Sequence, residues 1–114
     1  MEELVARLSA ATGLDPVVAR KAAAIILRFL VAEGPADKVG PLVDALPGAA
    51  DVVKSQPPIA GGIMGAFNDL TAAGLGMGEI QGAARTFVDF ARERAGAATV
   101  DRIVAGIPGL SQFI

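Results

Sequence analysis

Several residue types that proteins use for chemistry and recognition are missing from this chain. It has 114 residues but no cysteine, histidine, tryptophan or tyrosine. The lack of cysteine excludes disulfides, thiolate nucleophiles and cysteine-ligated metals. The lack of histidine excludes Ser-His-Asp triads and the usual zinc sites. Because only carboxylates and arginines remain for catalysis, we expect a non-enzymatic protein with no cofactor.

Strong charge and long hydrophobic runs are also missing. Ten basic and twelve acidic residues give a net charge of −2, with the two signs interspersed, which argues against a nucleic-acid partner. The longest uncharged stretch, residues 55–68, contains two prolines and is too short to cross a bilayer as a helix, so no transmembrane segment is expected. The first residues lack the basic and apolar regions of a signal peptide, which predicts a cytoplasmic protein.

What the chain has in abundance is small and medium-sized apolar residues. Hydrophobic residues make up 53% of the sequence, mean hydropathy is +0.53, and phenylalanine is the only aromatic type. No segment alternates apolar and polar residues with a period of two, so no sheet is expected. The composition instead suits closely packed helices. We predict an all-α protein, a compact helical bundle forming a single domain over residues 1–114.

The sequence also indicates an internal repeat at an offset of 61 residues, which aligns residues 1–53 with 62–114 without a gap. Eleven of the 53 aligned pairs are identical, only about twice what this composition gives by chance, so the pattern carries more weight. Apolar positions stay in register, and both Pro-Gly dipeptides, at 47–48 and 108–109, directly follow an apolar helical stripe. We therefore predict two similar halves joined by a linker at residues 54–61.

Each half is predicted to contain three helices, for a total of about six. Asp15 is a helix cap with Pro16 at the first helical position, while Gly13 and Gly34 mark helix ends. Two consecutive prolines, Pro57 and Pro58, place the linker between the halves. The expected helices lie at about 2–11, 16–34 and 35–46 in the first half and at 62–73, 80–94 and 100–107 in the second.

Two features could carry chemistry, but each has a simpler explanation. Asp89 and Glu93 lie one turn apart near arginines, as an acid/base pair could, although this pattern is more typical of a solvated helix face with salt bridges. The segment Gly74-Leu75-Gly76-Met77-Gly78 loosely resembles a phosphate-binding loop. It lacks the preceding strand or Gly-Lys-Ser/Thr motif that such loops need, so we interpret it as an interhelical turn.

The helix expected at 62–73 is the best candidate for a functional surface, because its polarity is low on every side. One side is large and apolar, whereas the other is built from small residues that let a second helix approach closely. This helix either packs entirely into its own core or presents a site for a partner or an apolar ligand. The candidate site residues are Ile63, Met64, Gly65, Ala66, Phe67 and Leu70.

Four short motifs resemble segments of small bacterial helical proteins of unknown function, including YidB-like proteins. They are Gly13-Leu14-Asp15-Pro16, Leu46-Pro47-Gly48, Gly61-Gly62-Ile63-Met64-Gly65 and Ile107-Pro108-Gly109-Leu110. The resemblance covers most of the chain and implies a bacterial helical domain. It implies no catalytic residues.

Three hypotheses for function follow from these observations. The first is a helical interaction or assembly module that associates with itself as a homodimer, because apolar surface is abundant and reactive side chains are scarce. The second is a binder of an apolar small molecule or lipid in a cavity between the halves. The third, an enzyme that works through carboxylates alone, is the least favoured.

Overall fold

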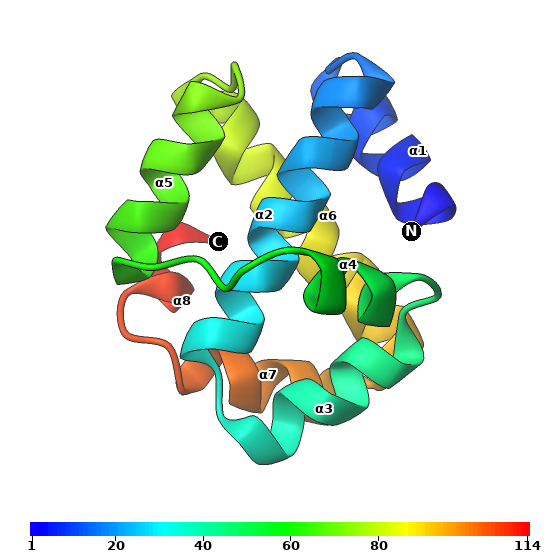
Figure 1. Ribbon diagram of the computed structural model, residues 1–114, viewed down its shortest axis with the longest axis vertical. Helices are drawn as coiled ribbons and strands as arrows, with labels where there is room; N and C mark the ends of the chain where they lie inside the picture. The colour runs from blue at the N-terminus through cyan, green and yellow to red at the C-terminus, as the bar shows by residue number, and fades with distance from the viewer.

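Eight α-helices account for most of the chain (Figure 1). The computed structural model describes residues 1–114, apart from the side chain of Phe113. No strand occurs in this described part, so the predicted all-α class is confirmed. The helices are α1 (Glu2–Thr12), α2 (Pro16–Glu33), α3 (Ala36–Ala45), α4 (Ala49–Ser55), α5 (Gly62–Ala72), α6 (Met77–Ala95), α7 (Ala97–Ala105) and α8 (Leu110–Phe113).

The prediction of about six helices is wrong, because the two Pro-Gly dipeptides do not end the helical structure. Gly48 and Gly109 adopt left-handed conformations, with φ of 84° and 85°, and turn the chain into the short helices α4 and α8. The predicted linker 54–61 is also shorter than expected, since its first two residues end α4. No helix formed by the described residues is both long enough and apolar enough to span a bilayer.

Helix α2 begins where the predicted capping residues place its start. The Asp15 side chain accepts a hydrogen bond from the Val17 N–H at 2.8 Å, and Pro16 occupies the first helical position, where its missing N–H has no cost. Gly13, with φ of 77°, ends α1 in the left-handed conformation that an L side chain resists. Local sequence therefore sets the boundary between α1 and α2.

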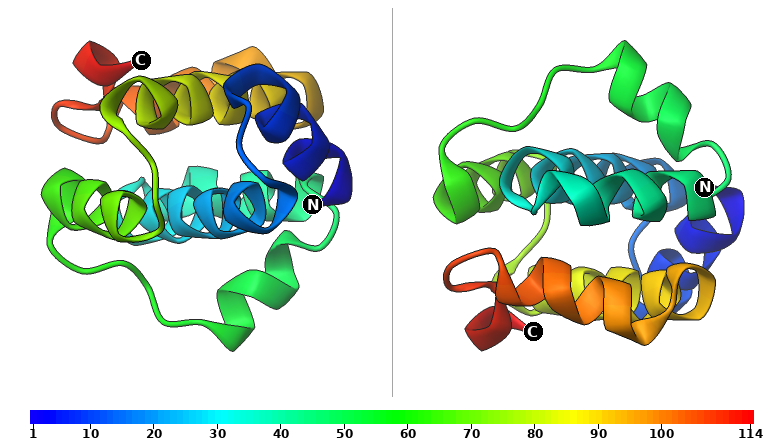
Figure 2. Two further views of the ribbon diagram at one scale, coloured as in Figure 1. Left: turned by 90° about the horizontal axis from the view of Figure 1, so that it is seen from above. Right: turned by 90° about the horizontal axis from the view of Figure 1, so that it is seen from below.

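The two long helices, α2 and α6, cross at the centre of the molecule (Figure 1). Figure 2 shows α2, α3 and α5 in one layer and α6, α7 and α8 in the other. The first layer is covered on its outer side by α4 and the segment 56–61, while α1 closes one edge of the molecule. Both long helices carry alanines that are almost completely buried, and such small side chains let other helices approach closely. These alanines are Ala19, Ala22, Ala23, Ala83 and Ala91.

The core consists of apolar side chains contributed by both layers. Its most deeply buried large members include Phe87, Leu27 and Ile80, together with Leu4 and Leu8 of α1. None of the described polar or charged side chains is buried. Burial of apolar surface is therefore the main source of stability, at roughly 25 cal/mol for each Å² removed from water.

Ion pairs join the two ends of the sequence at the α1–α6 contact. Arg7 donates two hydrogen bonds to the Glu93 carboxylate, at 2.6 and 2.9 Å, and Arg94 pairs with Glu3. The guanidinium groups of Arg7 and Arg94 both lie over the ring of Phe90, at 5.2 and 5.0 Å from its centroid. Phe90 is 3% exposed, so charged groups cover the edge of the core at this point.

The bounds of the helices correspond between the two parts of the chain. Starting residues lie 61 apart for α2 and α6, for α3 and α7, and for α4 and α8, and 60 apart for α1 and α5. Of two aligned pairs, Phe29 and Phe90 are both buried, whereas Val43 is only partly buried and Val104 is buried. The helix starts therefore recur at an offset of 60 or 61 residues, whereas both members are buried in only one of these two pairs.

We expect Phe29→Ala and Phe90→Ala each to lower the free energy of unfolding by about 3–5 kcal/mol, because each leaves a cavity in the core. Denaturation by urea, followed by circular dichroism, measures this loss. Val17→Ala is the control, since Val17 is 63% exposed, and it should change the free energy by less than about 0.5 kcal/mol. Phenylalanine variants as stable as this control would contradict the core assignment.

A second expectation concerns pH, because the hydrogen bonds from Arg7 lower the pKa of Glu93. A lowered folded-state pKa stabilises the fold above the unfolded-state value of about 4.3, and this contribution is lost as pH falls through the folded-state pKa. Glu93→Gln and Arg7→Gln should therefore both flatten the decline of stability below pH 5. The measurement is a series of urea denaturation curves between pH 6 and pH 3; unchanged slopes in both variants would contradict the role of this pair.

Candidate functional site

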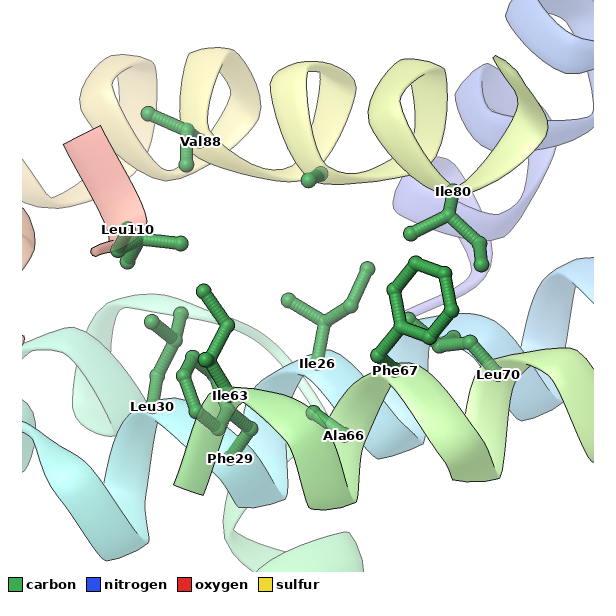
Figure 3. A pocket seen from close by; sticks show the side chains of 11 residues that line it. Ile26, Phe29, Leu30, Ile63, Ala66, Phe67, Leu70, Ile80, Val88 and Leu110 are labelled. Carbon is green, nitrogen blue, oxygen red and sulfur yellow. The ribbon is translucent and has the colours of Figure 1, made fainter. Parts of the chain in front are cut away.

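An apolar cleft lies between α5 and α6, and the other walls come from α2 and α8 (Figure 3). Every residue that lines it is apolar. From α5 come Ile63, Ala66, Phe67 and Leu70; from α6, Ile80, Ala84 and Val88; from α2, Ile26, Phe29 and Leu30; and from α8, Leu110. In Figure 3 the α6 side chains face those of α2 and α5 across the gap.

Helical spacing on α5 explains why four of the six candidate site residues reach this cleft. The positions 63, 66, 67 and 70 recur at the spacing that places side chains on one face of a helix. Ala66 and Leu70 are buried at the bottom of this face, while Ile63 and Phe67 are only partly buried and lie at its sides. Four of the six candidate residues therefore line one wall of the cleft, and among them Ala66 lies with the large apolar residues instead of on the opposite side of the helix.

The other two candidates, Met64 and Gly65, lie outside the cleft. Met64 is 64% exposed, the highest value among the large apolar residues described. Gly65 lies beneath the backbone of the segment that leads into α5: a Cβ atom at this position would be 1.8 Å from the Ala60 carbonyl oxygen. The small residues of α5 thus serve packing within the chain, because Gly65 contacts Ala60 and Ala66 is 6% exposed.

The cleft exists because α5 does not fill the space that α1 fills on the other side of the molecule. Leu4, Val5 and Leu8 of α1 are buried against α2 and α6. At the positions 61 residues later, α5 has Gly65, Ala66 and Asp69. Smaller or charged residues cannot occupy the same volume, so α5 packs mainly on α2 and leaves a hollow in front of α6.

The hollow is narrow, with a cavity volume of about 40 Å³. Pockets for drug-sized ligands have volumes of roughly 300–1,000 Å³, and an engineered cavity that accepts benzene has roughly 150 Å³. The cleft as it stands therefore admits a group the size of part of one side chain. Since it is open to the surface and has no polar lining group, that group must be apolar and must come from outside.

The sequence offered no signal for the residues of α2, α6 and α8 that line the cleft. Those of α2 and α6 fall on the apolar stripes of their own helices, where they are indistinguishable from residues of an ordinary core. Leu110 lies in α8, a helix that the sequence analysis did not predict. Only the packing of four helices brings these side chains together.

The two features considered for chemistry are structural in the folded chain. Glu93 is bound by Arg7, and Asp89 lies 3.5 Å from Arg92 on an exposed face, as expected for a surface with salt bridges. In the glycine-rich turn, the Glu79 carboxylate accepts the Gly76 N–H at 2.8 Å. A negative charge thus already occupies one donor of this turn, which disfavours binding of an anion there.

Comparison with known proteins identifies no relative: no protein-family model, no curated protein and no solved structure matches the chain. The resemblance to YidB-like proteins stays a prediction. The interpretation of the cleft therefore depends on its own geometry.

We expect Gly65→Ala to destabilise the fold by about 1–3 kcal/mol, because the added methyl group would displace the Ala60 carbonyl and with it the entry to α5. Gly78→Ala is the matched control: apart from its chain neighbours, nothing lies within 4 Å of the added Cβ atom, so alanine should stabilise α6 by up to about 1 kcal/mol. Urea denaturation of both variants tests this difference. Equal effects would show that the segment before α5 does not cross Gly65.

Proposed function

We propose that this protein is a non-enzymatic helical interaction module that associates with itself as a dimer through the α5 face. The observation that supports the proposal most directly is an exposed apolar side chain, Met64, beside an apolar hollow to which the same helix contributes four residues. A projection and a hollow on the same helix suit a two-fold symmetric contact, because each copy presents the same surface to the other.

Size and chemistry both favour a side chain as the occupant of the hollow. Its cavity volume of about 40 Å³ is too small for a drug-sized molecule but suits the end of a methionine. The lining has no hydrogen-bonding side chain, so an inserted group gains only from leaving water and from packing. Methionine is flexible and polarisable, and it adapts to irregular apolar hollows. In the proposed dimer, Met64 of each copy enters the cleft of the other.

The alternative, binding of an apolar small molecule or lipid, would use the same cleft. Its all-apolar lining suits such a ligand, but the cleft would first have to widen several-fold by movement of α5 away from α6. Self-association needs no such opening. We therefore place dimerisation first and treat ligand binding as the outcome to expect if the protein is monomeric.

Met64→Asp should dissociate the dimer without unfolding the chain, because it places a charge in an apolar contact while the free monomer exposes this position to water. Analytical ultracentrifugation over a range of concentrations measures the mass against that of the 11.5 kDa chain. The control is Val17→Asp, which makes an exposed apolar residue acidic about 13 Å along α2 from Ile26, the nearest cleft residue of that helix.

A second variant tests the hollow instead of the projection. Ala84→Leu puts a larger apolar side chain into the cleft from α6, and it should give a folded monomer in which Met64 is unchanged. Circular dichroism checks helicity for every variant. A wild-type chain that is monomeric at high micromolar concentration, or an Ala84→Leu protein that remains a dimer, would contradict the proposal.

We also propose that residues 1–53 and 62–114 are equivalent units related by an approximate two-fold rotation. Support comes from the shared order of the helices and from reciprocal packing, in which α1 contacts α6 and α5 contacts α2. At the positions aligned with Leu4, Val5 and Leu8 of α1, α5 has smaller or charged residues. In this interpretation, the binding surface arose where one half stopped filling its share of the core.

A further inference from the structure

A second hollow, away from the apolar cleft, lies along the outer side of α2. Its volume is about 260 Å³, several times that of the cleft. The floor is apolar and comes from Ala24, Ile25 and Ala73, the residue that caps α5. Above this floor are Arg20, Lys21, Arg28 and Gln56, so three cations and one amide form the walls of the groove, and none of its lining residues is acidic.

Two of the three cations already have partners within the chain. Arg20 forms a bidentate pair with Glu2, at 2.5 and 2.9 Å. Arg28 holds the segment before α5, donating from Nε to the Pro57 carbonyl and from Nη1 to the Gln56 side chain, both at 2.9 Å. Its Nη2 group makes no hydrogen bond to a described residue, and neither does the Lys21 ammonium. Two positively charged hydrogen-bond donors, the Lys21 ammonium and the Arg28 Nη2 group, thus remain available in this groove.

Formation of a long central helix does not require cations at these positions. At the positions 61 residues later, α6 has Gln81, Gly82 and Asp89 in place of Arg20, Lys21 and Arg28, and it forms a helix of nearly the same length. The chain as a whole has a net charge of −2, whereas the residues that line this groove carry a net positive charge.

We propose that this groove binds the head of a small anionic amphiphile, a phosphate or carboxylate group carried on a short apolar stem. Lys21 and the Nη2 group of Arg28 receive the oxyanion, because charged donors make the stronger hydrogen bonds to such groups. The first carbons of the stem lie over Ala24 and Ile25. None of the residues that line the groove belongs to α5 or lines the apolar cleft, so this site is separate from the dimer contact proposed for α5.

Hexyl phosphate and inorganic phosphate are the two probes that test this site. Titration into the ¹⁵N-labelled full chain should shift the amide signals of Ala24, Ile25 and Ala73. Hexyl phosphate should bind at least about tenfold more tightly than inorganic phosphate, since burial of two methylene groups is sufficient for that factor. Equal affinities would overturn the role of the apolar floor, and shifts confined to other parts of the chain would overturn the site.

The decisive variant is Lys21→Gln, because Lys21 has no partner whose loss would disturb the fold. It should weaken hexyl phosphate binding about five- to tenfold while the thermal midpoint stays unchanged. Lys38→Gln is the matched control, because it removes the same charge from α3, outside the groove. The Lys38 ammonium has one acidic neighbour, the Asp37 carboxylate at 3.9 Å, and its removal should leave the affinity for hexyl phosphate unaltered. Equal weakening in both variants would show a general charge effect and overturn the proposal.

Vesicles of phosphatidylglycerol separate a membrane surface from a soluble ligand. Co-sedimentation with such vesicles that hexyl phosphate displaces, and that Lys21→Gln weakens, would identify a lipid headgroup as one source of the anion and support the groove. Binding to vesicles without any response to hexyl phosphate would show that an extended surface recognises the membrane, and it would overturn the proposed groove.

Discussion

The close crossing of α2 and α6 is the constraint on which the rest of the structure depends. Both helices present alanines that are fully or almost fully buried, among them Ala22 and Ala83, each 0% exposed. Small side chains let two helices approach closely, and the larger apolar residues beside them then extend outward on both flanks. The other helices add to this cross: α1 and α5 lie at its flanks, while α3 and α7 contact each other at one end.

The crossed helices α2 and α6 have α1 packed on one flank and α5 on the other, and the two flanks differ: the first is a closed core and the second contains the open cleft. On the first flank, Leu4 and Leu8 of α1, which packs on both long helices, are 1% and 0% exposed. On the second, the corresponding positions of α5 hold Gly65 and Asp69, and α5 uses a different face, centred on Phe67, for its apolar contacts. Under the two-fold relation that we propose, the cleft follows from a difference in side-chain volume at equivalent positions.

The sequence predicted those parts of the fold that short-range chemistry determines. Asp15 and Pro16 marked the start of α2, and the spacing of Ile63, Phe67 and Leu70 marked the face of α5 that reaches the cleft. Two short helices were missed because a Pro-Gly pair indicates a turn without indicating whether a helix follows. The walls from α2 and α6 could not be predicted, because apolar residues on a helix look the same in a core and in a cleft.

The pairing of Arg7 with Glu93 and of Arg94 with Glu3 spans 86 and 91 residues of sequence. During synthesis at roughly 5–20 residues per second, α1 therefore waits on the order of ten seconds for the helix against which it packs. In that interval its apolar side, with Leu4, Val5 and Leu8, has only α2 as a neighbour. The apolar side of α1 is thus synthesised long before α6, the helix that completes its burial.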